Sequence, residues 1–235
     1  MQSHAQNSNR PPDHGGSPHS SDEQQSYFAI FGLPEKLTLE TTALERDFYK
    51  LSRKLHPDLF ARKSAEEQAW SLRQSSLLND AYRTLKDPVS RTAYLLKLEG
   101  LAVEDENQES RPTVSRDPNA KQNRVPADLL EEVFELNMQL EEMRADLKMG
   151  EDDPALRSDL ERAQQQFKGM LASVDADLRA AWTAWDSAFD ANDSAAKDKQ
   201  KNAMLALLDR RSYLRNLLRE VGSVLAPDTP GAATQ

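Results

Sequence analysis

The aliphatic residues of this chain are almost all of the kinds that favour helices. Its 235 residues include 31 Leu and 28 Ala, but only eight Val and one Ile. Sheets are enriched in β-branched residues, because these side chains pack well on a pleated surface, whereas Leu and Ala are strong helix formers. We therefore expect an all-α fold, and neither an all-β fold nor a doubly wound parallel sheet.

Three further features of the composition exclude whole classes of protein. The chain has no Cys, which excludes disulfide scaffolds, cysteine catalysis, iron–sulfur ligation and zinc ribbons. Its longest uninterrupted apolar runs are five residues, whereas a membrane span needs about 20, so we expect no membrane partner. A net charge of −9 argues against a nucleic-acid partner. Because the N-terminal segment also lacks the apolar core of a secretory signal, we expect a cytoplasmic protein.

Charge and helical periodicity divide the chain into two folded units. Residues 27–100 carry 12 Lys and Arg against 10 Asp and Glu, whereas residues 126–227 carry 13 against 20. The polar segment 101–125 between them has no helical period and is predicted to be a linker or exposed loop. Residues 1–26, rich in Gln, Ser, His, Pro and Gly, are predicted to form a disordered tail, and residues 228–235 a second tail.

The first unit is predicted to contain four helices. A short helix begins at Tyr27, and a second spans residues 41–55. A third is capped by Ser64 and stops before Pro88. A fourth begins there and runs to Gly100, with Tyr94, Leu95 and Leu98 facing inward. In the second helix, apolar residues at steps of 4, 3 and 4 predict one buried stripe of Leu44, Phe48, Leu51 and Leu55. A basic face lies off that stripe and consists of Arg46, Lys50, Arg53 and Lys54.

His56-Pro57-Asp58 stands directly after the basic helix. Pro57 ends that helix and stiffens the loop, so that an imidazole and a carboxylate project at fixed positions beside the cationic face. A metal site or an acid–base pair is one alternative, and a routine helix stop with Asp58 capping a turn is another. The other three histidines, His4, His14 and His19, lie in the predicted tail, and one His makes a poor metal site, so we expect neither a metal nor another cofactor.

A short helix, a basic helix, His-Pro-Asp and a capped helix, in that order, resemble the J-domain of DnaJ-type co-chaperones. The chain resembles more closely the HscB family of J-type co-chaperones in iron–sulfur cluster biogenesis. That resemblance covers roughly residues 26–226 and is carried by YFAIFGLP at 27–34, LHPDLF at 55–60, LNDAYRTLKDP at 78–88 and RTAYLL at 91–96.

This resemblance implies a co-chaperone rather than an enzyme, with residues 27–100 as the J-domain. It implies that a surface of His56, Pro57, Asp58, Arg46, Lys50, Arg53 and Lys54 binds an HscA/DnaK-type chaperone and stimulates its ATPase. It also implies delivery of the iron–sulfur scaffold protein IscU to that chaperone, which promotes cluster transfer and maturation of iron–sulfur proteins. The alternative is a J-domain co-chaperone with a different client.

The second unit is predicted to be an antiparallel three-helix bundle over residues 126–149, 154–191 and 194–225. In its first helix a complete seam faces the bundle, formed by Leu129, Val133, Leu136, Leu140, Met143 and Leu147. Leu130, Phe134 and Met138 lie about 100 to 180° from that seam. A second, outward apolar stripe indicates an intermolecular contact, and the alternative is packing on the J-domain or the third helix.

In the last helix the expected inward residues are Met204, Leu207, Leu214, Leu218 and Val221, with Tyr213 off that stripe and Arg211 interrupting the pattern. By the HscB resemblance, the family's scaffold-binding residues fall on Leu130, Phe134, Glu135, Glu142 and Tyr213. Met138 stands where that family would have an acid. The 101–125 insert is long for the family and predicts a more mobile hinge between the units.

Overall fold

The computed structural model describes residues 25–102 and 129–226. The first range contains α1 (Tyr27–Ile30), α2 (Thr41–Leu55), the 3-10 turn η1 (Pro57–Phe60), α3 (Ala65–Lys86) and α4 (Pro88–Leu98). The second contains α5 (Leu130–Met149), α6 (Pro154–Asp190) and α7 (Ser194–Leu225). Within these two ranges the regular structure is helical throughout, which confirms the all-α prediction. Nearly all of the predicted tails and linker, with the first residues of the predicted helix from Pro126, lie outside the described residues.

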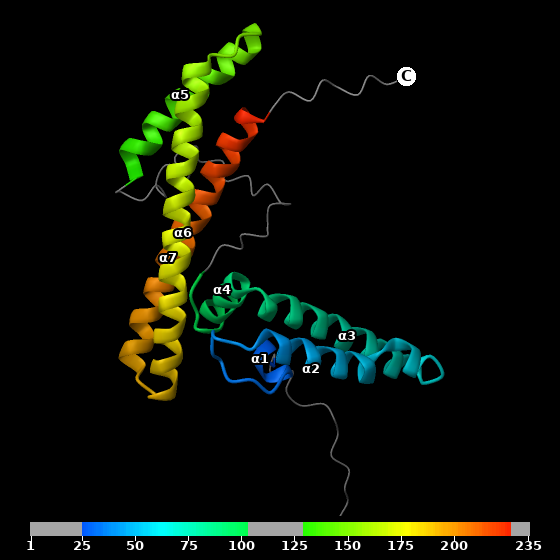
Figure 1. Ribbon diagram of the computed structural model, residues 1–235. Coiled ribbons are helices and arrows are strands. Elements are labelled where there is room, and N and C mark those ends of the chain that lie inside the picture. The colour runs from blue at the N-terminus through cyan, green and yellow to red at the C-terminus, as the bar shows by residue number, and fades with distance from the viewer. Residues whose placement is uncertain (1–24, 103–128, 227–235) are drawn as a thin grey trace, which may run out of the picture.

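The hairpin of α2 and α3 extends away from the long helices α6 and α7 (Figure 1). Leu44 of α2 is buried, and Phe48 stacks on Tyr82 of α3 with 4.1 Å between ring centroids. At the start of α3, the Ser64 side chain accepts a hydrogen bond from the Glu67 N–H, and the Glu67 carboxylate accepts one from the Ser64 N–H. Local side-chain chemistry therefore sets where α3 begins, as the sequence predicted.

The buried face of α4 differs from the prediction at Leu98. Asp87 caps this helix and Pro88 is its first residue, as expected, but Leu98 is exposed and Leu96 is fully buried instead. The buried face passes through Leu95 and Leu96 and next reaches Glu99, whose carboxylate lies 3.0 Å from the Lys201 ammonium group of α7. The inward position at the end of α4 is therefore taken by an ion pair, and the prediction for Leu98 was wrong.

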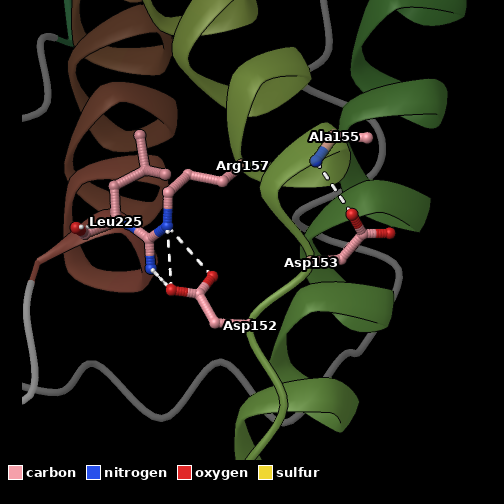
Figure 2. Close-up of polar contacts among 5 residues, drawn as sticks. All are labelled: Asp152, Asp153, Ala155, Arg157 and Leu225. Atoms are coloured by element: carbon pink, nitrogen blue, oxygen red, sulfur yellow. Dashed lines mark hydrogen bonds and ion pairs between the residues drawn. The ribbon is translucent and has the colours of Figure 1, made fainter.

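In the second unit, α5 packs beside α6, while α6 and α7 run antiparallel along most of their length (Figure 1). The predicted α5 seam is buried from Leu129 to Met143. Figure 2 shows how the turn before α6 is fixed: Asp153 accepts the N–H of Ala155 at 2.8 Å, and Arg157 binds the Asp152 carboxylate. The same Arg157 donates to the carbonyl of Leu225 at 3.1 Å, which ties the start of α6 to the end of α7.

The interior face of α7 is offset by one residue from the prediction at two positions. Leu208 and Leu217 are the buried residues, whereas Leu207 and Leu218 are only half-buried. Arg211 lies between them, mostly buried, with its Nε 2.7 Å from Asp175 Oδ1 of α6. A buried cation needs such a partner, because desolvation of an unpaired charge is costly. The largely apolar α6–α7 interface therefore contains an ion pair that the sequence showed only as an interruption of the apolar pattern.

A domain joint, formed by Glu35, Leu37 and Thr38 of the first unit with Trp185 and Asp186 of α6, connects the two units. The Asp186 carboxylate accepts the backbone N–H of Leu37 at 2.7 Å and that of Thr38 at 2.9 Å. The Trp185 indole donates to the Glu35 carbonyl at 3.0 Å. Leu37 and Trp185 are both fully buried here. Direct bonds between the units therefore set how they sit in this structure. The 101–125 segment predicted to form a mobile hinge lies almost entirely outside the described residues.

We expect Asp186→Ala to lower the free energy of unfolding by about 1–2 kcal/mol, because the buried Leu37 N–H loses its acceptor while the exposed Thr38 N–H can turn to water. Denaturant unfolding measures this. The matched control is Asp190→Ala, which removes an exposed ion pair with Lys36 and should cost less than about 1 kcal/mol. Equal losses in the two variants would show that the joint adds no more than a surface charge pair.

Candidate functional site

The start of the His-Pro-Asp loop is held against α3 by two hydroxyl groups. α2 ends at Leu55, whose carbonyl accepts hydrogen bonds from Ser71 at 2.7 Å and Ser75 at 2.9 Å. Helix ends leave carbonyl groups without a partner in the helix, so these serines supply what the end of α2 lacks. The sequence analysis missed both serines. The signal that could have found them was two hydroxyl residues one turn apart on the face of α3 that otherwise carries buried apolar residues.

His56, Pro57 and Asp58 form the turn that follows. The Asp58 N–H donates to His56 Nδ1 at 3.3 Å, and the same nitrogen lies 3.5 Å from the Asp58 carboxylate. With Nδ1 accepting, a neutral ring carries its proton on Nε2, which is then a donor available to a partner. Both side chains are exposed, so the loop presents a donor and an acceptor at the surface.

The basic face of α2 continues from this loop. Arg46, Lys50, Arg53 and Lys54 are all exposed, and at 100° per residue they span an arc of about 100° on the helix. Arg53 Nε donates to the Tyr49 carbonyl at 3.2 Å, which holds this guanidinium along the helix. α2 leads directly into His56, and of the seven residues predicted for chaperone binding six have exposed side chains and Pro57 is half-buried.

The outward apolar residues of α5 form a second surface, on the other unit. Leu130 is 53% exposed, Phe134 68% and Met138 60%. Their spacing of four places them in a row along the helix, and we name them the α5 stripe. The alternative that this stripe packs on the J-domain or on α7 is therefore excluded for this structure. Glu135 and Glu142 are exposed on the same helix, so the stripe has acidic neighbours.

Tyr213 of α7 differs from the other residues predicted to bind the scaffold. It is half-buried and packs against the core, and this burial raises the pKa of its phenol. Its pKa is raised further by Glu220, which is also bound by Arg144 of α5 at 2.9 Å. Tyr213 therefore supports the packing of the bundle, which its position off the predicted stripe did not indicate.

Comparison with known proteins shows which proteins this chain is similar to. The DnaJ domain family model matches residues 26–94. Chaperone HscB from Vibrio cholerae is 25% identical, with 85% of this chain and 97% of that chain covered and a TM-score of 0.50. The chain contains a J-domain and is similar to an HscB chaperone over most of its length. Human co-chaperone HscB, 23% identical with 91% of each chain covered and a TM-score of 0.52, shares the fold.

The J-domain and the likeness to HscB indicate a chaperone of the Hsp70 class as the partner of this chain. Across residues 25–102 and 129–226, no group of three or more His, Asp or Glu side chains is placed to hold a metal ion. In the same parts of the chain, no helix is long and apolar enough to cross a membrane.

Proposed function

We propose that this protein stimulates the ATPase of an HscA/DnaK-type chaperone and delivers an IscU-type iron–sulfur scaffold protein to it, which promotes cluster transfer and maturation of iron–sulfur proteins. One observation supports this most strongly: the exposed α5 stripe lies on a different unit from the His-Pro-Asp loop. A single chain with two separate surfaces can hold a chaperone and a client at the same time.

The chaperone surface combines charge with a rigid loop. The loop is fixed by the bonds of Ser71 and Ser75 to Leu55, so His56 and Asp58 are positioned before a partner arrives. Such preorganisation lowers the entropy cost of binding. The adjacent cations would attract an acidic surface and speed its approach. Together they suit a partner that is acidic where it meets α2 and that bonds to His56 and Asp58.

The scaffold surface is apolar at its centre and acidic at its edge. Large apolar side chains at the centre of a contact commonly carry most of its energy, whereas charges at the rim set orientation and specificity. A client for the α5 stripe should therefore present an apolar patch flanked by cations. Met138 makes the stripe longer and more apolar than a carboxylate at that position would.

We expect the double charge reversal Arg53→Glu, Lys54→Glu to weaken chaperone binding and to leave scaffold binding unchanged. The reversed charges would repel an acidic partner, and the effect should shrink as salt is added, because exposed charges are screened. Titration of each partner at two salt concentrations measures this. A simultaneous loss of both interactions would indicate misfolding rather than a local change of charge.

The proposed function itself is tested by the ATPase rate of a DnaK-type chaperone. The rate is measured with this protein alone, with an IscU-type scaffold alone, and with both. We expect the two together to raise the rate more than either alone. If the J-domain stimulates but the scaffold adds nothing and does not bind, the client is another protein, which is the alternative function.

A further inference from the structure

We propose that Tyr49 and Leu59 are apolar anchors of the chaperone contact, Tyr49 beside the basic face and Leu59 next to the His-Pro-Asp loop. This inference rests on the proposed function and extends it to the chemistry of the partner. The chaperone surface that fits here has apolar pockets beside its acidic groups, so part of the binding does not depend on charge.

Tyr49 is 56% exposed although it is a large aromatic residue. It lies one helical turn from both Arg46 and Arg53, and therefore borders the basic face. Its ring rests against Phe48, with 5.4 Å between centroids, and Phe48 is in turn stacked on Tyr82. The aromatic ring is thus backed by a packed layer, so little conformational freedom remains to be lost when a partner covers it.

Leu59 is 61% exposed and follows Asp58 directly in the turn η1. Its N–H donates to the His56 carbonyl at 3.0 Å, so its position is tied to the loop. The next residue, Phe60, instead packs toward α3, with its ring 5.8 Å from that of Trp70. In η1, therefore, Phe60 packs toward α3, whereas Leu59 stays at the surface.

The occupant that covers both residues is the chaperone, because the two positions are continuous with the surface it is proposed to bind. Asp58 and Leu59 are consecutive and both side chains are exposed, so a partner that surrounds the Asp58 carboxylate would also lie beside Leu59. A partner that pairs with Arg53 likewise reaches Tyr49 on the next turn. Tyrosine and arginine side chains that become desolvated together in a contact are typical of residues that dominate binding energy.

The test compares Tyr49→Ala and Leu59→Ala in the full chain with the charge reversal at Arg53 and Lys54. Binding to a DnaK-type chaperone and half-maximal ATPase stimulation are measured at about 0.1 M and about 1 M salt, where charges are screened beyond roughly 10 Å and 3 Å. Each alanine variant should weaken binding about tenfold at both salt concentrations. The charge reversal should weaken it mainly at low salt. Maximal stimulation should be kept in the alanine variants, because His56 and Asp58 remain.

Leu72→Ala is the matched control, because Leu72 is an exposed leucine of α3 outside this surface. It should bind as the unchanged protein does, and Tyr49→Phe should keep most of the affinity. Wild-type affinity in both Tyr49→Ala and Leu59→Ala would overturn the inference, as would a loss confined to low salt. If the unchanged protein bound the chaperone without stimulating it, the proposed function would fail, and the binding data would still decide whether these residues are anchors.

Discussion

His56→Gln should abolish stimulation of the chaperone ATPase at protein concentrations at which the unchanged chain stimulates fully. In the structure Nδ1 of His56 accepts the Asp58 N–H, which leaves Nε2 of a neutral ring as a donor for a partner. A glutamine side chain has one more rotatable bond and a single terminal amide, so it cannot hold both ring-nitrogen positions at once. Steady-state ATPase assays with increasing amounts of each protein measure the effect.

The same variant should fold normally, since the His56 side chain is exposed and contributes little to the core. Its melting temperature should therefore stay within a few degrees of that of the unchanged protein. Ser71→Ala is a useful companion, because it leaves His56 in place but removes one bond that holds the loop. Full stimulation by His56→Gln at matched concentration would refute the role given to this loop.

The triple variant Leu130→Ala, Phe134→Ala, Met138→Ala should lose at least a hundredfold in affinity for an IscU-type scaffold. Residues at the centre of a contact often contribute about 2 kcal/mol or more each, and 1.4 kcal/mol corresponds to tenfold in affinity. All three side chains are exposed in the chain alone, so the free energy of unfolding should change little. Calorimetric titration with the scaffold, paired with a melting curve, tests both statements.

Tyr213 is better examined separately, because its partial burial mixes packing with any contact it makes. Tyr213→Phe keeps the ring in the bundle and removes only the hydroxyl group. Basal chaperone stimulation should survive in every α5 variant, since the His-Pro-Asp loop lies on the other unit. A triple variant that melts many degrees lower would show that the stripe stabilises the fold. Unchanged scaffold affinity would place the client site elsewhere.

Helix ends were predicted well wherever local residues determine them. Ser64 with Glu67, Asp153 with Pro154, and the left-handed Gly150 each act within a few residues, so the sequence contains the whole signal. The faces of α4 and α7 were harder to predict, because Lys201 meets Glu99 and Arg211 meets Asp175 across different helices. A periodic pattern of apolar residues does not reveal which charged residue has a partner inside.

For the candidate surfaces too, features set by nearby residues could be predicted and features set by distant residues could not. The basic face and the α5 stripe could be predicted because each lies on one helix and depends only on its period. The hydrogen bonds that support the His-Pro-Asp loop could not be predicted, because Ser71 and Ser75 donate to the Leu55 carbonyl, 16 and 20 positions away in the sequence. The domain joint was missed for the same reason, because Asp186 binds backbone groups that precede it by 149 and 148 positions.

The domain joint has a consequence for which segments of a client the chaperone can reach. Because Trp185 and Asp186 fix the J-domain to one level of α6, that helix acts as a spacer of set length. An α-helix rises about 1.5 Å per residue, so each turn of α6 away from the joint adds about 5 Å to the separation. A client bound on the α5 stripe must bridge a set gap to a chaperone bound at His56. Removing four residues from α6 would shorten that gap by about 6 Å and, because one turn takes 3.6 residues, would rotate one partner by about 40° relative to the other.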